Sequence, residues 1–428
     1  MWSSAEGLFV GEPVTAVPAD DEAMHADDGA AHADNGAAHA DDGAAHADDG
    51  AAHADDGAAH ADDGAAHADD GAAPVRGNLD HARPRRHHRA SLSLVLAGCS
   101  LLLLIVISAA VGIGSVAISP AAVWHVVISH LAGRPAATVD DEIIWQIRLP
   151  RVLLAAVIGA ALTTAGTVVQ VLVRNALADP YLLGISSGAS VGATAVLLFG
   201  AFASLGLWAI SAGSIVGALI AMATVFAVAR QNGTLAPTQL ILCGVVMAAF
   251  FEAITSFLIF RGNPQATQSI LFWLLGSFGL ASWSQLPIPA ICLLAAVGYL
   301  ITQGRALNAL AMGPGAAAAL GIDVRRLRRD LYIATSLVAG VAVAVSGVIG
   351  FVGLVVPHIV RLLVGSDHRR VLPAGALAGA AFMTAADLLA RTIVAPQEMP
   401  IGVITAFIGA PALVILIRRR PYSYGTTE

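Results

Sequence analysis

The chain has 428 residues, of which 57% are apolar and only 12% are charged. Soluble globular domains carry about 25% charged residues, so the composition argues against a soluble protein and favours a membrane protein. All 23 basic residues are arginine, which excludes a P-loop lysine or a Schiff-base lysine in this chain. If ATP drives this protein, another chain must bind it.

The first 75 residues form an acidic, repetitive segment with 18 of the 30 acids and no basic residue. Alanine is the only recurring apolar residue of its heptad and is too small for a coiled-coil seam, while glycine and paired aspartates oppose helix. We therefore predict a disordered acidic tail over 1–75. Its heptad histidines could bind divalent metal loosely, or the repeat could be a tandem expansion with no dedicated ligand. These histidines are His25, His32, His39, His46, His53, His60 and His67.

The three cysteines, Cys99, Cys243 and Cys292, lie within separate apolar runs. They form no Cys-x-x-Cys or Cys/His cluster, so neither a disulfide framework nor a zinc site is indicated. We interpret them as small apolar side chains, and we predict no metal site in the remainder of the chain.

A basic juxtamembrane segment, 76–91, precedes a series of apolar runs long enough to span a membrane. The first run, at about 92–118, is too long for the core of a secretory signal. Glycines 347, 350 and 353 divide the run 331–364 into two helices, which gives about ten in all. The other runs lie at about 152–173, 182–200, 206–229, 239–260, 285–303, 373–395 and 401–417, and amphipathic pieces are expected at 120–131 and 266–280.

The distribution of arginine predicts the orientation of these helices. With the N-terminus inside, 17 arginines fall in cytoplasmic segments and four fall outside, as the positive-inside rule requires. Both termini are then cytoplasmic, including a short tail at 421–428. The pairs Gly159–Gly166 and Gly340–Gly347 both have the spacing G-x6-G, and the two predicted helices that contain them run in opposite directions. Such a correspondence is typical of an inverted repeat. We predict an all-α polytopic membrane protein with a transmembrane domain over 92–420.

The string from Gly184 to Gly188 matches the G-x-S-x-G pattern of a serine nucleophile elbow. An intramembrane hydrolase would use Ser186 or Ser187 with His358. However, an elbow requires a strand before the turn, and this string begins a membrane helix. Gly184, Gly188 and Gly192 also form consecutive GxxxG spacings, so close helix packing is the favoured interpretation.

Ionisable residues within the predicted spans are few. Glu252 and Asp387 could couple a secondary carrier to protons, since carboxylates inside a membrane are usually functional. Asp387 could instead pair with Arg391 one helical turn away. The scarcity of such groups favours a translocation path whose energy enters elsewhere.

Several long strings resemble the FecCD-type permeases of ABC importers, which move iron chelates, haem and cobalamin. They occur in the family's order over about residues 90–420, and the acidic repeat lies outside them. They comprise Arg148–Arg151, Gly159–Leu162, Arg174–Ala189, Gly350–Arg361, Asp367–Arg369, Glu398–Val403 and Gly409–Pro411.

The resemblance implies the membrane subunit of an importer that carries a metal chelate, most often a ferric siderophore. This chain would catalyse no reaction and hold no cofactor, because two partner ATPase subunits bind ATP and Mg. The other implied partners are a second permease subunit (an identical copy or a paralogue) and an extracytoplasmic substrate-binding protein, without any nucleic acid. The implied location is the bilayer of the bacterial cytoplasmic membrane.

The resemblance also implies three functional regions. Arg148, Arg151 and Arg391 would face acidic residues of the binding protein, and Pro237 and Thr238 would lie at the inner gate. A coupling loop, 304–330, would contact the ATPase through residues matching the family's coupling helix: Gly313, Pro314, Gly315, Ala317, Leu320 and Gly321.

Two departures from the family pattern stand out. Ala176 occupies a position where the family usually has proline, which predicts a less rigid turn after Asn175. The coupling loop has Pro314, Gly315 and four alanines where relatives carry acidic and polar residues, which predicts altered contacts with the ATPase.

Overall fold

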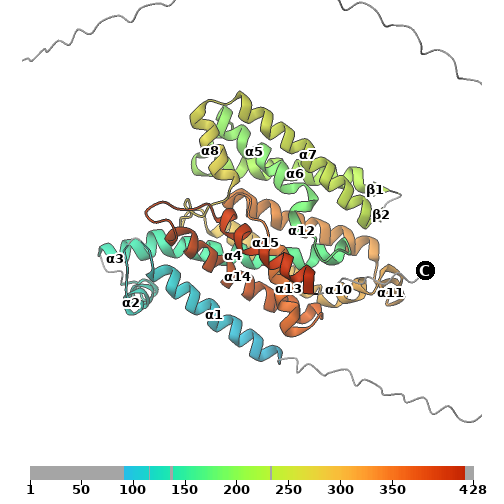
Figure 1. The fold of residues 1–428 in the computed structure, drawn as a ribbon, viewed down its shortest axis with the longest axis horizontal. Helices are drawn as coiled ribbons and strands as arrows, with labels where there is room; N and C mark the ends of the chain where they lie inside the picture. Colours follow the sequence, from blue (N-terminus) through green and yellow to red (C-terminus); the bar gives the residue numbers. More distant parts are fainter. Residues whose placement is uncertain (1–90, 115, 135–137, 232–233, 420–428) are drawn as a thin grey trace, which may run out of the picture. The chain divides into compact units, whose positions relative to one another are not determined.

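A computed structural model of the chain describes residues 91–114, 116–134, 138–231 and 234–419 (Figure 1). The predicted acidic tail with its histidines, residues 76–90 of the basic segment, and residues 420–428 lie outside the described residues. Most of the described chain is helical.

The first half contains α1 (Leu92–Gly112), α2 (Pro120–Leu131), α3 (Val139–Glu142), a π-helical turn η1 (Ile143–Arg148), α4 (Leu149–Leu172), a 3-10 turn η2 (Pro180–Leu183), α5 (Ile185–Phe199), a 3-10 turn η3 (Ala203–Trp208), α6 (Ala209–Ala229), a short hairpin of β1 (Arg230–Gln231) and β2 (Thr234–Leu235), and α7 (Pro237–Arg261). The second half contains α8 (Pro264–Leu274), α9 (Pro287–Thr302), α10 (Gly304–Ala311), α11 (Pro314–Ala319), α12 (Val324–Ser346), α13 (Val352–Val364), α14 (His368–Thr392) and α15 (Ile401–Arg419).

Each predicted apolar run contains a helix, and the fold is that of an all-α polytopic membrane protein. Among the described residues, six helices are long and apolar enough to cross a membrane, or seven if α9 and α10, bent by 56°, form one span. The remaining predicted spans correspond to the shorter helices α5, α13 and α15. The amphipathic pieces correspond to α2 and α8.

The central helix of the described fold is α4, which contacts α9, α12, α13 and α14 (Figure 1). The apolar window of its span is 83% buried, whereas that of α1 is 11% buried. Small residues permit this packing, because a Cβ at Gly159 would overlap the carbonyl oxygen of Gly379 in α14 and one at Gly166 would overlap that of Gly353 in α13. The outer faces of α1 and α7 remain apolar and exposed, as expected for surfaces that meet lipid.

The glycines of α5 pack against α6 and α7. Gly188 and Gly192 lie against Gly217 and Gly213 of α6, where a Cβ at Gly192 would overlap the Gly213 carbonyl oxygen. Gly184 precedes α5 with a left-handed φ of 73° and follows the 3-10 turn η2. No strand precedes this turn in the described part of the chain, so the nucleophile elbow required by the hydrolase alternative is not formed.

Several predicted helix boundaries are wrong: α12 begins at Val324 rather than 331, α14 begins at His368 rather than 373, and α8 ends at Leu274 rather than 280. Two more lie in the first half of the chain. The first helix ends at Gly112 rather than near Ile118, since Ser119 and Pro120 start the separate helix α2 with a side-chain cap. The second begins before residue 152, because α3, η1 and α4 form one continuous helical segment from Val139 to Leu172.

Candidate functional site

Three helix ends meet inside the described fold: the C-terminal ends of α8 and α12 and the N-terminal end of α15. The backbone N–H of Ser277 donates to Ser346 O at 2.8 Å, and those of Ile401 and Gly402 donate to Gly276 O at 3.1 Å and Leu275 O at 3.0 Å. These bonds satisfy backbone groups that the broken helices leave free. Gly276 and Gly347 adopt φ values of 77° and 69°, which other residues rarely reach, so the junction requires glycine.

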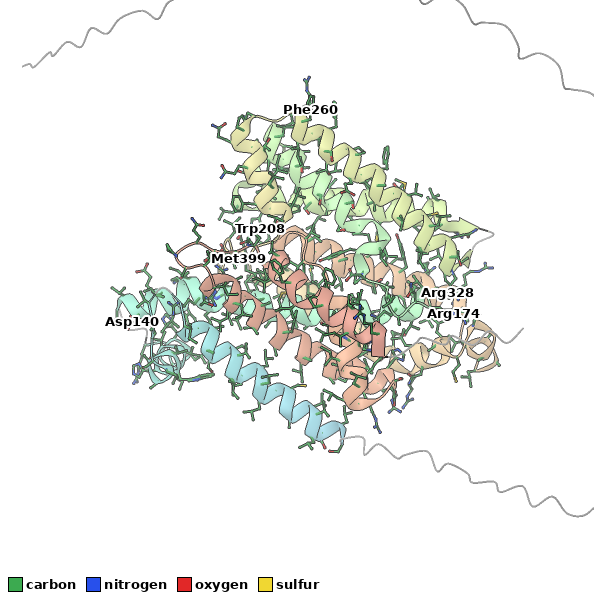
Figure 2. The ribbon with its side chains drawn as sticks, viewed as in Figure 1. Asp140, Arg174, Trp208, Phe260, Arg328 and Met399 are labelled. Carbon is green, nitrogen blue, oxygen red and sulfur yellow. The ribbon has the colours of Figure 1, made fainter. Side chains whose placement is uncertain are left out.

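A cavity of about 550 Å³ adjoins this junction. Its wall combines aromatic surface with a few polar groups, and it holds a single charged side chain among the described lining residues, Glu398. Trp208 and Met399 are two of the lining residues, and both are labelled in Figure 2. A cavity of this size with broad apolar walls and sparse polar groups suits a bulky, largely apolar ligand.

A second cavity of about 460 Å³ also adjoins this junction, since Leu275 and Gly402 are among its lining residues. Leu275, Val348, Phe351 and Phe407 line it, and its walls are apolar. Broken helices that flank cavities are typical of the substrate sites of membrane transporters. The junction and its two cavities are therefore the candidate site for a translocated molecule.

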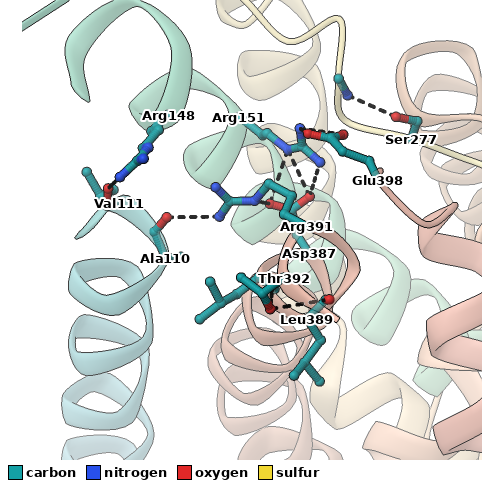
Figure 3. A network of polar contacts seen from close by, with 12 residues as sticks. Ala110, Val111, Arg148, Arg151, Ser277, Asp387, Leu389, Arg391, Thr392 and Glu398 are labelled. Carbon is teal, nitrogen blue, oxygen red and sulfur yellow. Dashed lines mark hydrogen bonds and ion pairs between the residues drawn. The ribbon is translucent and has the colours of Figure 1, made fainter. Parts of the chain in front are cut away.

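A buried ion cluster lies at the predicted outer end of α4 and α14 (Figure 3). The carboxylate of Asp387 is 1% exposed and accepts from Arg151 Nε at 3.0 Å, with Arg151 Nη2 at 2.9 Å. Arg391 Nε lies 3.1 Å from Asp387 Oδ2, an ion pair not aligned as a hydrogen bond. Arg151 Nη1 also donates to Glu398 Oε1 at 2.9 Å. We refer to these four residues as the Asp387 cluster.

Arg148 and Arg391 also connect neighbouring elements. Arg148 donates to the carbonyl oxygens of Val111 and Gly112 at 2.8 and 3.0 Å, and Arg391 donates to that of Ala110 at 2.9 Å (Figure 3). Both therefore bind the C-terminal end of α1.

The structure thus brings the three arginines of the predicted docking site together, but as buried groups. The side chains of Arg148, Arg151 and Arg391 are engaged by this chain's own carboxylates and carbonyls. Their role in docking stays a prediction. The exposed member of the Asp387 cluster is Glu398, whose side chain is 49% exposed. Sequence reasoning assigned no role to this residue, although its motif was part of the family resemblance.

Asp387 does not have the surroundings of a proton carrier. Two guanidiniums neutralise it, and Glu252 lies on an exposed face of α7. The secondary-carrier alternative therefore has no free buried carboxylate at either residue.

The predicted coupling loop forms two short helices and the start of α12. Gly313, with a φ of 114°, precedes α11, and Gly321, with a φ of 79°, follows it. Ala317, within α11, is fully buried, whereas Met312 and Leu320 are 67% and 64% exposed. Two exposed apolar side chains beside a rigid turn form a knob that suits a protein contact.

Asn308 fixes this knob to the start of α14. Its amide donates to Asp367 Oδ1 at 2.7 Å, and its oxygen accepts from the His368 backbone N–H at 2.9 Å. The bond from Asn308 lowers the pKa of Asp367, which keeps this carboxylate ionised. Asn308 therefore links α10 to the start of α14.

The predicted inner-gate residues lie beside the β1–β2 hairpin. Pro237 begins α7 at the N1 position, and Thr238 is exposed. The hairpin pairs Arg230 with Leu235, and Arg328 in α12 donates to Leu235 O at 3.2 Å. The start of α7 is thus held to α12.

The turn between α4 and α5 is ordered without the proline that the family usually has at position 176. Arg174 adopts a left-handed φ of 53°, and the Asn175 side chain accepts from Leu177 N at 2.9 Å. The Asn175 side chain thus closes an Asx turn across position 176, and the lower rigidity expected from Ala176 stays a prediction. Asp179 then caps η2 by accepting from Tyr181 N at 2.9 Å.

Burial raises the pKa of Asp179 to about 6. A raised carboxyl pKa gives a contribution to stability that is present below about pH 4 and lost as pH rises through 6. We therefore expect Asp179→Asn, whose amide oxygen can still accept from Tyr181, to increase stability at pH 7.5 by up to about 3 kcal/mol and to change it little at pH 4. Thermal unfolding in detergent at both pH values measures this. A lower stability of the variant at pH 7.5 would contradict it.

The FecCD transport family matches residues 101–419, most of the chain and all of the described transmembrane helices except the start of α1. The chain belongs to the FecCD transport family. Among curated relatives, it is 39% identical over 339 residues to the hemin transport system permease protein HmuU of Yersinia pestis, covering 78% of this chain and 97% of that protein. It is 37% identical over 341 residues to the vitamin B12 import system permease protein BtuC of Vibrio cholerae, covering 79% of this chain and 96% of that protein.

A solved structure agrees with the fold. A metal-chelate type ABC transporter in an inward-facing conformation is 32% identical and has a TM-score of 0.68, covering 77% of this chain and 100% of that chain. The uncovered part of this FecCD chain corresponds in size to the N-terminal region outside the described residues. The family resemblance expected from the motifs is confirmed.

Proposed function

We propose that this FecCD family member is the permease subunit of an ABC importer that moves a metal chelate across the cytoplasmic membrane of a bacterium. The junction of α8, α12 and α15 carries the proposal, because broken helices there flank two cavities suited to a bulky, largely apolar molecule. Ionisable groups in the lining are confined to Glu398 among the described residues, so ion coupling along this path is not supported. The N- and C-termini would both be cytoplasmic.

The substrate class that we propose is a metal chelate, with a ferric siderophore first and the tetrapyrroles hemin and vitamin B12 beside it. Two relatives are named for hemin and vitamin B12. Trp208, Phe272 and Trp273 provide aromatic surface in the larger cavity, against which a planar ring system could pack.

The partners follow from the permease role. Two ATPase subunits would bind ATP and Mg, a second permease subunit would complete the path, and an extracytoplasmic binding protein would deliver the chelate. On the cytoplasmic side, the ATPase would press on the knob at Met312 and Leu320. Asn308 would pass that displacement to α14, which is a rod of roughly 37 Å, since a helix rises about 1.5 Å per residue. The other end of α14 carries the Asp387 cluster.

Uptake by cells with and without this gene tests the proposal. We expect loss of uptake of one of three labelled chelates, namely a ferric siderophore, hemin or cobalamin, and restoration by the plasmid-borne gene. Uptake that continues after ATP depletion but collapses with an uncoupler would contradict the ABC role.

Leu320→Asp is expected to separate ATP hydrolysis from transport. A charge on the exposed apolar knob would disfavour its burial against the ATPase, so we expect uptake to fall about tenfold or more while the ATPase subunits still hydrolyse ATP. The matched control is Leu131→Asp, which places the same charge on the 78% exposed end of α2. Equal uptake by both variants would exclude a coupling role for the knob.

A further inference from the structure

An arginine-lined cleft lies at the other end of the molecule from the Asp387 cluster, between the last turn of α6, the β1–β2 hairpin and the first turns of α12. Its volume is about 560 Å³, and its walls include Phe226, Arg230, Arg325, Arg326 and Arg329. Its α12 residues fall in the last part of the predicted coupling loop, after the residues Gly313 to Gly321 that match the family's coupling helix.

The charges around this cleft are poorly balanced. Asp323 is the single acid among its lining residues, and it pairs with Arg326 at 3.0 Å. Arg329 pairs with Asp330 at 2.9 Å, outside the lining. Within the described residues, neither Arg230 nor Arg325 forms an ion pair, and the Arg230 guanidinium lies 5.9 Å from the centre of the Phe226 ring. Four guanidiniums thus face one cavity with a single carboxylate.

Orientation in the membrane alone does not require this arrangement. The positive-inside rule counts basic residues in a loop, whereas here arginines from β1 and α12 converge on one cavity. Guanidinium groups bind phosphate oxygens with paired N–H donors. Basic pockets between transmembrane helices on the cytoplasmic side are suited to anionic lipid head groups.

The surroundings of the cleft distinguish a lipid from a soluble anion. The adjoining helix α6 carries exposed apolar side chains along its length, with Val216, Ile220 and Val228 43%, 54% and 57% exposed. A phosphate held at Arg230 would therefore have an apolar helix face beside it, against which acyl chains could lie.

We propose that this cleft binds the phosphate of an anionic phospholipid head group from the cytoplasmic leaflet. The bound phosphate would accept from Arg230 and Arg325 and join the β1–β2 hairpin to α12. Arg328 already donates a hydrogen bond to Leu235 O, which links α12 to the hairpin. If the proposed transport function holds, the lipid would stabilise the hairpin that precedes the inner gate at Pro237. Lipid binding itself does not depend on that function.

Lipid retention by the purified full-length protein tests the proposal. Native mass spectrometry would compare protein loaded with cardiolipin, phosphatidylglycerol or zwitterionic phosphatidylcholine. We expect the double variant Arg325→Gln/Arg326→Gln to retain about tenfold less anionic lipid, since each arginine near a membrane surface contributes substantially to binding. The matched control, Arg305→Gln/Arg418→Gln, removes two exposed arginines from elsewhere on the predicted cytoplasmic side and should retain lipid as the native protein does.

Gel filtration confirms that each variant is folded before retention is measured. Equal retention of cardiolipin by the native protein and the cleft variant would overturn the proposal. Displacement by millimolar inorganic phosphate, without preference for anionic over zwitterionic lipid, would assign the cleft to a soluble phosphate and would also overturn it. Neither result depends on transport, so failure here is distinguishable from failure of the proposed function.

Discussion

Asp387→Ala is expected to destabilise the protein by about 3–5 kcal/mol, because removing one partner of a buried ion pair leaves uncompensated charge. Arg151 and Arg391 both depend on this carboxylate, which is 1% exposed. Arg391 also donates to Ala110 O, so the variant should loosen the C-terminal end of α1 as well. Thermal unfolding in detergent and the yield of monodisperse protein measure the effect.

Glu398→Gln provides the matched control. It also removes a carboxylate from Arg151, but the Glu398 side chain is 49% exposed, and exposed ion pairs contribute about 1 kcal/mol or less. We therefore expect little change in stability. A loss from Asp387→Ala no larger than that from Glu398→Gln would show that the Asp387 cluster does not hold the helices together.

The helices could be predicted from the sequence because each apolar run is long and is interrupted by glycine, proline or arginine. The division of 331–364 at its glycines agrees with the break between α12 and α13, where Gly347 has a φ that other residues rarely adopt. The predicted helix boundaries were wrong where one local signal continued a helix and another ended it. At 112–120, the apolar pattern continues past Gly112, but the cap at Ser119 and the proline after it start a new helix.

The candidate site depended on information that local pattern does not contain. The i,i+4 pair of Asp387 and Arg391 was visible in the sequence, and the structure confirms it. The pairing of Asp387 with Arg151 joins residues 236 positions apart, and no periodicity signals it. The junction at Gly276 and Ser346 likewise arises from the packing of distant helix ends. The arginine cleft also needs the hairpin and α12 to converge before its charges share one cavity.

Gly192→Ala is expected to destabilise the contact between α5 and α6 by about 1–3 kcal/mol, the usual range for overpacking a tight contact. The added Cβ would overlap the carbonyl oxygen of Gly213, and backbone cannot rotate away as a flexible side chain can. The helices would have to separate, which also removes contacts at Gly188 and Gly217. Thermal unfolding in detergent measures the loss.

The same substitution at Gly298 in α9 isolates this steric cause. A Cβ there meets no atom within 4 Å, so Gly298→Ala adds only helix propensity and should stabilise the protein by about 1 kcal/mol or less. The two variants make the same chemical change within helices and are expected to shift stability in opposite directions. If Gly192→Ala were also neutral or stabilising, the close approach of α5 and α6 would not depend on glycine, and the GxxxG spacing from Gly184 to Gly192 would need another explanation.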